Sequence, residues 1–239
     1  VAYYPDYIYP SQHTAEPKAA QASIQEQIAA DIERMRRIGL KLIRMGEFSW
    51  GHVEPHPGKV DFSRFLFALD RAKDAGIQAI LCTPTATPPK WFVDQHPETL
   101  PVDRQGRTIP FGGRRHYDPS SESFRAASRR ITKLYAEALG KHAAVVGWQT
   151  DNEIGNHSSW QSFTPTARDQ FRAWLRQHYN NDIQALNEAW FTCFWSMQFR
   201  DFDEIDLPVA TWTAPNPHLE MDFRRFMTCL LYTSPSPRD

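Results

Sequence analysis

A carboxamide and a carboxylic acid stand side by side at the end of an apolar segment, where Asn152 and Glu153 close the stretch "VVGWQTDNE". Hydrolysis of a glycoside needs one carboxylic acid to protonate the leaving oxygen and a second carboxylate to stabilise or attack the anomeric carbon. An amide beside the acid can hold a sugar hydroxyl. The pair therefore indicates half of a glycosidase site, although on the dipeptide alone a plain turn after a strand is the simpler interpretation.

A second carboxylate and two guanidinium groups are further candidates. Glu47, in "RMGEFSW", ends another apolar segment and is a candidate hydroxyl ligand or the missing partner of Glu153. The simpler interpretation pairs it with Arg44 or with a loop amide. Arg114 and Arg115, in "GGRRHYDP", lie in a Gly-flanked loop, where a guanidinium group can hold a sugar hydroxyl or pair with a catalytic carboxylate. A solvated charged pair is the default for such a run.

Trp195, in "FWSM", is less regular than its aromatic neighbours and is a candidate for stacking on the apolar face of a sugar ring, with core packing as the equal alternative. Other aromatic residues fall at helical spacing and are expected in the core: Phe171, Trp174 and Tyr179. His116, His157 and Cys193 show no metal-ligand spacing. We expect neither a metal nor a cofactor.

The elements that must position these side chains follow one order, helix, Gly and apolar strand, which occurs three times. Ser23 and Glu26 form a capping box that predicts a helix up to Gly39, followed by a strand in "KLIRMGEF". The same order returns in residues 62–84 and 121–153. With a further strand expected in "VAYYPDY", the sequence predicts an α/β fold with a parallel sheet of about four strands.

Polar residues follow each expected strand, at Tyr3 and Tyr4, at Glu47, over 83–89 and over 151–153. In (β/α)8 barrels and in open doubly wound sheets, the carboxyl ends of the strands form the active site. The first strand is not followed by a Gly-rich phosphate loop, which argues against a nucleotide-binding fold. This context favours a catalytic interpretation of the pair at the third strand end.

After Asn156 the pattern changes to aromatic-rich helical segments and an irregular stretch that contains proline. No linker marks a second domain. We therefore expect the later part to be an elaborated loop over the barrel mouth rather than a second domain.

The composition limits the partners. Lys and Arg (27) nearly balance Asp and Glu (28), so no global field would attract nucleic acid or an anionic membrane, and a small neutral ligand is expected. No apolar run is long enough for a membrane span and no leader is visible, although the chain does not begin with Met. Three widely spaced cysteines indicate neither a disulfide framework nor a zinc ribbon, and they fit the cytoplasm.

Separated motifs in a fixed order give the sequence a family resemblance: "RMGEFSW", "TPTATPPKW", "LPVDRQGR", "FGGRRHY", "GWQTDNE" and "ALNEAWFTCFWS". The chain resembles the N-terminal half of glycoside hydrolase family 42, the β-galactosidases with a (β/α)8 TIM barrel. The resemblance covers residues 1–228 and implies one partial catalytic domain, the N-terminal portion of that barrel, with about four or five of its strands. It also implies a retaining hydrolase of terminal non-reducing β-D-galactose residues that acts on a small β-galactoside or galacto-oligosaccharide as a homo-oligomer.

The resemblance implies a role for each candidate residue. Glu153 is similar to the acid/base, Asn152 to its substrate-binding neighbour and Arg114 to a sugar-binding arginine. Glu47 is similar to a hydroxyl-binding carboxylate, and Trp195 to an aromatic residue that lines the pocket. Galactose is implied by the resemblance alone, and α-arabinopyranose, which lacks only a hydroxymethyl group, stays open as a substrate.

Two departures from the family pattern matter. Many members hold a structural zinc with a cysteine after "RRHY" and a cysteine cluster after "DNE", whereas Asp118 stands at the first position here and the second stretch has no cysteine. Zinc is therefore not expected. The stretch "IYPSQHTAEPKAAQA", residues 8–22, is longer than in the family, and its effect on the pocket is open.

In the family the nucleophilic glutamate lies on a later strand, past any residue of this chain. The last residues, "CLLYTSPSPRD", are a direct translation of a transposase-type sequencing adaptor, so we expect residues 229–239 to be an adaptor-derived tail. The chain would then be an inactive fragment of a β-galactosidase parent. A half-barrel exposes a sheet edge and an apolar face, so self-association or aggregation is expected.

Two alternatives stay open. In the first, the chain is a non-catalytic carbohydrate-binding half-barrel that holds sugars with Arg114, Asn152 and Trp195. In the second, the chain is catalytic, with Glu47 as the nucleophile and Glu153 as the acid/base. Retention by that pair requires the two carboxyl groups to lie about 5 to 5.5 Å apart.

Overall fold

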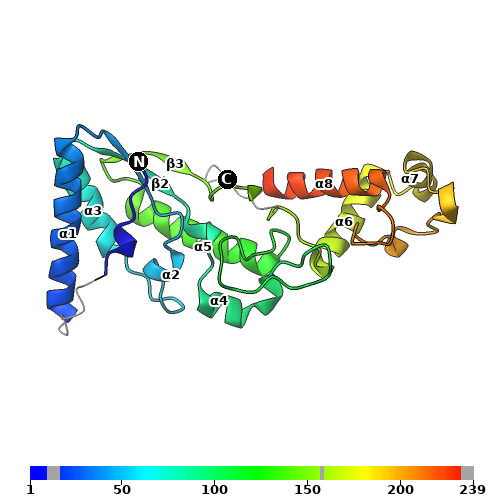
Figure 1. Cartoon of the computed structure of the whole chain (residues 1–239), viewed down its shortest axis with the longest axis horizontal. Helices are drawn as coiled ribbons and strands as arrows, with labels where there is room; N and C mark the ends of the chain where they lie inside the picture. Colours follow the sequence, from blue (N-terminus) through cyan, green and yellow to red (C-terminus); the bar gives the residue numbers. More distant parts are fainter. Residues whose placement is uncertain (10–16, 157–158, 233–239) are drawn as a thin grey trace. The chain divides into compact units, whose positions relative to one another are not determined.

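A computed structural model of the chain describes residues 1–9, 17–156 and 159–232 (Figure 1). The chain divides into two compact units. Unit 1 comprises Val1–Gln95 and Ser128–Glu153, and unit 2 comprises His96–Ala127 and Ile154–Asp239. One boundary falls inside helix α5 (Glu122–Leu139), and another directly follows Glu153.

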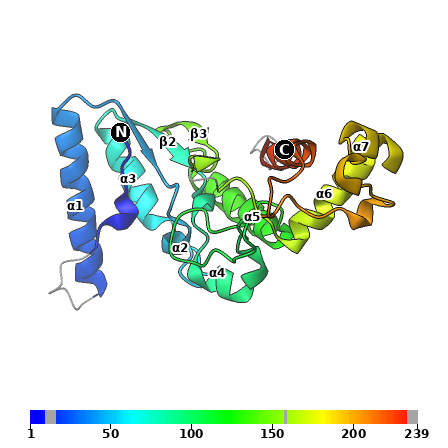
Figure 2. The ribbon, with the colours of Figure 1, turned by 45° about the vertical axis from the view of Figure 1, so that its right-hand side comes forward.

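The helices of unit 1 each bury one face. They are α1 (Pro17–Arg37), α2 (Trp50–Val53), α3 (Ser63–Asp74), α4 (Lys90–Gln95) and the part of α5 from residue 128. Helices α1 and α3 lie side by side (Figure 2). Their buried apolar residues include Ile28, Ile32, Phe65 and Leu69. Such spacing by three and four residues places apolar side chains on one face of a helix, as the sequence predicts.

Helix α1 begins at Pro17, earlier than the predicted capping box of Ser23 and Glu26, which lies inside the helix. Proline suits the first turn of a helix because its missing N–H group would have no partner there. The residues that follow, "KAAQA", are strong helix formers, so the helix extends back to the proline. Its end agrees with the prediction, because Gly39 follows in the left-handed conformation with φ of 79°.

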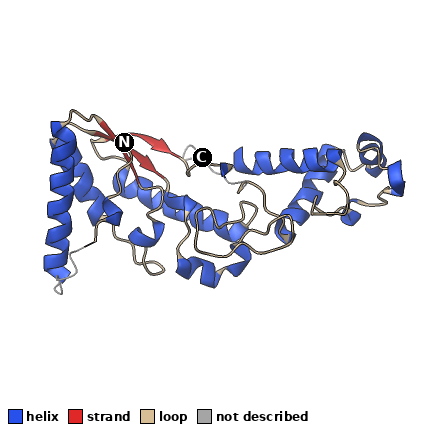
Figure 3. Cartoon of the chain, in the orientation of Figure 1, coloured by secondary structure: helices blue, strands red, loops and turns tan. Residues whose placement is uncertain are grey.

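The strands of unit 1, drawn in red in Figure 3, form a parallel sheet. Their order in the sheet is β1-β2-β3. Its strands are β1 (Leu42–Met45), β2 (Gln78–Cys82) and β3 (Val145–Gln149). Each is a short apolar segment after a helix, which suits parallel strands because helical crossovers join them. The carboxyl ends of the three strands therefore share one edge of the sheet.

The expected strand at the N-terminus is reduced to a single bridge between Ala2 and Arg44. Two backbone hydrogen bonds form it, from Tyr3 N–H to the Arg44 carbonyl (2.8 Å) and from Arg44 N–H to the Val1 carbonyl (2.8 Å). Pro5 then starts a 3-10 turn and has no N–H group to continue the pairing. The predicted count of about four strands is reached in the described residues only if this bridge is included.

Unit 2 contains α6 (Pro165–His178), α7 (Ile183–Ala189) and α8 (Pro217–Tyr232). Oγ1 of Thr164 caps α6 by accepting a hydrogen bond from the N–H group of Ala167 (3.1 Å). The buried core of this unit includes Phe171, Leu175, Leu186, Trp190, Phe223 and Phe226. Trp174 and Tyr179 pack against it, which confirms the predicted core role of these two residues and of Phe171.

Two further sequence predictions concern the C-terminus and membranes. Residues 229–232 of the predicted adaptor tail form the end of α8, and residues 233–239 lie outside the described part of the chain. Of the helices that the structure describes, none has both the length and the apolar character needed to cross a membrane.

Candidate active site

The carboxyl end of β1 presents a buried carboxylate. Gly46, with φ of 112°, comes so close to β2 that a Cβ atom there would lie 2.9 Å from the carbonyl oxygen of Cys82. The next residue, Glu47, is 0% exposed. Its Oε1 accepts hydrogen bonds from Nη2 of Arg44 (2.6 Å) and from Oη of Tyr4 (2.9 Å). The ion pair of Glu47 with Arg44, which was the simpler interpretation of the sequence, is present and involves Oε1 of the carboxylate.

The second oxygen, Oε2 of Glu47, is buried without a hydrogen-bond partner among the described residues. Leaving such an acceptor unsatisfied costs about 1 to 3 kcal/mol. The charge of Glu47 also affects the pKa of neighbouring groups. Burial, and then the charge of Glu47, raise the pKa of the Cys82 thiol to about 12. Burial likewise raises the pKa of Asp6 to about 6, with a smaller contribution from Glu47. A donor such as a sugar hydroxyl would satisfy Oε2.

The carboxyl end of β3 holds the predicted acid and its neighbour. Asn152 is 5% exposed, whereas Glu153 is exposed. Asp151 and Glu153 both have left-handed backbones, with φ of 53° and 47°. The N–H group of Asp151 donates to Oγ1 of Thr83, the residue directly after β2 (2.7 Å). The turn that carries the acid is therefore attached to the end of the neighbouring strand.

Gln149, the last residue of β3, joins the two strand ends and was not singled out from the sequence. Its Oε1 accepts from Nη1 of Arg44 (3.0 Å), and its Nε2 donates to the Asp151 carbonyl (2.9 Å) and to Oδ1 of Asn152 (3.4 Å). Glu47 and Asn152 are thus connected through Arg44 and Gln149. The signal that could have revealed Gln149 is a polar side chain at the end of an apolar strand.

The remaining candidates lie in unit 2, so their placement is described only within that unit. Arg114 is exposed, whereas Arg115 is 5% exposed and donates from Nε to Oγ of Ser159 (2.7 Å). Its guanidinium group also lies over the ring of Tyr117, 5.3 Å from the centroid. Of the two arginines, Arg114 is the exposed one.

Trp195 is 65% exposed and stacks on Phe194, with the ring centroids 4.7 Å apart. Core packing of Trp195, the equal alternative in the sequence, is wrong, because an indole group so exposed is not part of a core. Its φ of 58° is unusual for a residue other than Gly. The structure thus presents an accessible aromatic surface within unit 2.

Asp118, which stands where the resemblance implies a zinc-binding cysteine in many members, is a hydrogen-bonded carboxylate. Asp118 is 0% exposed and accepts from the N–H group (2.8 Å) and Oγ (2.7 Å) of Ser120 and from Oγ1 of Thr164. These hydroxyl groups do not fit a zinc site of thiolates and imidazoles. Among the described residues, no three His, Cys, Asp or Glu side chains form a group that could hold a metal. His157 lies outside those residues.

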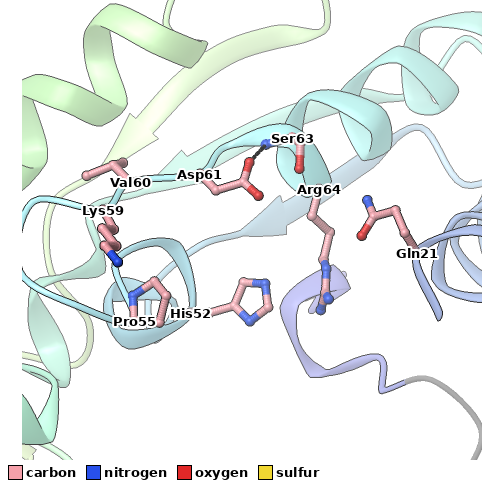
Figure 4. Close-up of a pocket in the computed structure, with 8 residues that line it drawn as sticks. All are labelled: Gln21, His52, Pro55, Lys59, Val60, Asp61, Ser63 and Arg64. Carbon is pink, nitrogen blue, oxygen red and sulfur yellow. Dashed lines mark hydrogen bonds between the residues drawn. The ribbon is translucent and has the colours of Figure 1, made fainter. Parts of the chain in front are cut away.

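A pocket of about 360 Å³ in unit 1 contains none of the predicted site residues (Figure 4). Its walls come from Gln21, His52, Pro55, Lys59, Val60, Asp61, Ser63 and Arg64. Burial, and then the charge of Arg64, lower the pKa of His52 to about 4. Asp61 accepts from the N–H group of Ser63 (2.8 Å), at the start of α3. The pocket therefore lacks the pair of carboxylic acids that glycoside hydrolysis requires.

Comparisons with known proteins identify the family. The profile of glycoside hydrolase family 42, described as "Beta-galactosidase", matches residues 19–233. The β-galactosidase BgaA of a Thermus species is 48% identical over 196 residues, which are 82% of this chain and 30% of that protein. The β-galactosidase Bga of Halorubrum lacusprofundi is 42% identical over 201 residues, 84% of this chain and 29% of that protein.

Solved structures agree with this relationship. The β-galactosidase from the psychrophilic Marinomonas ef1 matches with a TM-score of 0.88 and 41% identity, over 98% of this chain and 33% of that one. The catalytic domain of a β-amylase from Paenibacillus polymyxa, at 14% identity and a TM-score of 0.61, shares the fold alone. The parallel sheet and its helices are part of a (β/α)8 barrel, and the chain spans about a third of the length of the proteins it matches. The chain belongs to glycoside hydrolase family 42, the β-galactosidase family.

Proposed function

We propose that the chain supplies the acid/base part of the active site of a retaining β-galactosidase, which hydrolyses terminal non-reducing β-D-galactose residues. The observation that carries the proposal is the pair Asn152 and Glu153, just after β3, in a member of glycoside hydrolase family 42. Because the chain spans about 30% of the relatives that it matches, the proposal concerns the activity of the whole protein.

Glu153 is the proposed acid/base. In a retaining mechanism it first protonates the leaving oxygen while a second carboxylate attacks the anomeric carbon. It then takes a proton from the water that hydrolyses the galactosyl intermediate. The exposure of Glu153 supports this role, because the carboxyl group must reach both the leaving group and the water. The resemblance to the family suggests that the attacking carboxylate lies outside the residues of this chain.

Glu47 and Asn152 are the proposed ligands of sugar hydroxyls in unit 1. When the carboxyl group of Glu47 is ionised, its Oε2 accepts hydrogen bonds and cannot donate them. Nδ2 of Asn152 donates hydrogen bonds and cannot accept them. A hydroxyl group both donates and accepts, so the two side chains suit hydroxyls in complementary ways. From unit 2 we propose Arg114 as a hydroxyl ligand and Trp195 as a stacking surface for the sugar ring.

The near balance of 27 basic and 28 acidic residues supports a small neutral substrate rather than nucleic acid or a membrane. A β-galactoside or a galacto-oligosaccharide is the proposed substrate. We also propose that the whole protein is a cytoplasmic homo-oligomer. Activity on an α-arabinopyranoside is expected to be weaker than on the galactoside by about 10- to 200-fold, because one hydroxymethyl group separates the two sugars.

The test uses a chimera in which residues 19–228 of this chain, the part of the family match that precedes the expected tail, replace the matching region of the Thermus β-galactosidase. We expect the chimera to hydrolyse p-nitrophenyl β-D-galactopyranoside and Glu153→Gln to reduce kcat by at least about 100-fold. The matched control is Glu188→Gln, an exposed glutamate of α7. Full activity in a folded Glu153→Gln chimera would overturn the acid/base role. Galactose binding by the chimera without hydrolysis would favour the carbohydrate-binding alternative.

The alternative with Glu47 as nucleophile has its own test. A 2-deoxy-2-fluoro-β-galactosyl inactivator forms a slowly hydrolysed bond to the nucleophile of a retaining enzyme. We expect mass spectrometry of the inactivated chimera to find the label outside the peptide that contains Glu47. A labelled Glu47 would assign the nucleophile to this chain.

A further inference from the structure

A hydrogen-bonded relay crosses the carboxyl ends of β1 and β3, and its central member has no role in the function proposed above. We propose that Gln149 is a positioning residue that orients Asn152 and Glu153 through the backbone of Asp151. The inference rests on the proposed function of Asn152 and Glu153. It adds a residue that touches neither the substrate nor the reacting atoms.

Arg44 fixes the direction of every hydrogen bond in the relay, because a guanidinium group only donates. Nη2 of Arg44 donates to Glu47, and Nη1 donates to Oε1 of Gln149 (3.0 Å). Gln149 must therefore turn its Oε1 toward Arg44 and its Nε2 toward the turn after β3. There Nε2 donates to the Asp151 carbonyl (2.9 Å) and, at a longer distance, to Oδ1 of Asn152 (3.4 Å).

This polarity determines what Asn152 can offer to a ligand. Its Oδ1 is the acceptor for Gln149, so its Nδ2 is the end that donates to other groups. With the opposite amide orientation, Asn152 would present its acceptor end instead. The charge on Arg44 thus selects, through Gln149, the hydrogen-bonding character of a side chain proposed to hold a sugar hydroxyl.

The turn after β3 needs this support because its backbone is unfavourable. Asp151 and Glu153 have φ of 53° and 47°, values that residues other than Gly rarely adopt. Such a conformation persists only where the surroundings fix it. Oγ1 of Thr83 holds the N–H group of Asp151 (2.7 Å), and Nε2 of Gln149 holds its carbonyl group (2.9 Å). The direction in which the chain enters Asn152 and Glu153 is set by these two contacts.

Three substitutions separate the parts of the relay. Gln149→Met keeps a side chain of similar length but removes both the acceptor for Arg44 and the donor to Asp151. Gln149→Glu keeps the acceptor and removes the donor. Arg44→Lys keeps the charge beside Glu47 but loses the planar fork that spans two acceptors. Gln78→Met is the matched control, because Gln78 is exposed at the opposite, N-terminal end of β2.

The first test uses the 239-residue chain labelled with ¹⁵N-asparagine. We expect Gln149→Met, Gln149→Glu and Arg44→Lys to shift the backbone and side-chain amide signals of Asn152, and Gln78→Met to leave them in place. Should the Met variant fail to fold, the Glu variant, which is close to isosteric, serves in its place. Unchanged Asn152 signals in a folded Gln149 variant would overturn the proposal.

The second test measures kinetics in the chimera. We expect Gln149→Met to lower kcat/KM by about 10- to 100-fold, because a misplaced catalytic group costs about this much. The control Gln78→Met should leave kcat/KM unchanged. Combined with Asn152→Ala, the loss from Gln149→Met should be smaller than the sum of the two single losses, because both act on one contact. Additive losses, or full activity in Gln149→Met, would overturn the positioning role. Full activity in Asn152→Ala and Glu153→Gln would instead overturn the proposed function itself.

Discussion

Single residues at the strand ends could be chosen from the sequence in part. Glu47 and Asn152 were selected because each follows an apolar strand, and the structure places both at the carboxyl edge of one sheet. Gln149 was missed because the alternation of a short strand does not reveal which polar side chain turns toward a neighbour. The exposure of Trp195 was also undecided, since aromatic residues serve cores and surfaces alike.

Asp6 supplies a prediction at the residue scale. Burial raises its folded-state pKa to about 6, above the ordinary value near 4. The folded state therefore favours the protonated form, so the contribution of Asp6 to the free energy of unfolding should be highest below about pH 4, fall between pH 4 and 6, and level off above pH 6. Asp6→Asn should remove this decrease and raise the free energy of unfolding at pH 7 by about 1 to 3 kcal/mol.

Urea unfolding at several pH values measures this effect. Glu26→Gln, which changes an exposed carboxylate of α1, is the control and should leave the decrease in place. An Asp6→Asn protein whose unfolding free energy depends on pH between 4 and 7 as in the parent chain would contradict the account.

At the scale of elements, the repeated order of helix, Gly and strand was predictable because its periodicity is local. The start of α1 was not, since a capping box at Ser23 competes with a proline and good helix formers before it. The predicted N-terminal strand is reduced to a single bridge for another local reason, because Pro5 has no N–H group to continue the pairing. Local patterns thus predict which elements exist more securely than where they begin.

Glu54 gives a prediction at the element scale. The side chain is 0% exposed at the end of α2 and accepts from Nε1 of Trp50 (3.0 Å), the N–H group of Gly58 (2.8 Å) and Nη2 of Arg130 in α5 (2.6 Å). Glu54→Ala leaves these donors without their acceptor and should lower the free energy of unfolding by about 2 to 4 kcal/mol. Glu137→Ala on the same helix as Arg130 breaks only an exposed ion pair with Lys133 and should cost less than about 1 kcal/mol.

The same carboxylate predicts sensitivity to acid. Burial by itself would raise the pKa of Glu54, but the hydrogen bonds from Arg130, Trp50 and Gly58 outweigh it and lower the pKa. The contribution of Glu54 to stability is therefore present above its ordinary pKa and lost as the pH falls below it. Chemical unfolding should show a smaller loss on acidification in Glu54→Ala than in the parent chain. Equal losses would argue against this assignment.

At the scale of the whole molecule, the division into two compact units depends on contacts between positions that lie far apart in the sequence. Unit 2 joins His96–Ala127 to residues after Glu153 through contacts between distant positions. The ion pair of Arg104 with Glu220 (2.8 Å) is one of them, and the bond from Thr164 to Asp118 is another. Local periodicity contains no information on such contacts, and one catalytic domain over residues 1–228 stays a prediction.

Asp118 leads to a prediction about metals. Hydroxyl and amide donors already surround its carboxylate, so a bound zinc ion is not needed to hold this part of unit 2. Treatment with a chelator, followed by thermal unfolding, should leave the melting temperature unchanged, and added zinc should not raise it. Asp118→Ala, in contrast, should lower it. A fall in melting temperature after chelation would show that a metal stabilises the chain.

The most direct measurement of the central claim is azide rescue of the Glu153→Ala chimera with 2,4-dinitrophenyl β-D-galactopyranoside. This leaving group departs without an acid, so the galactosyl intermediate still forms, but its hydrolysis lacks a base. Azide needs no base, and we expect it to restore turnover and give β-galactosyl azide by NMR. If azide gives no acceleration, or if the product has the α configuration, Glu153 is not the acid/base of a retaining enzyme.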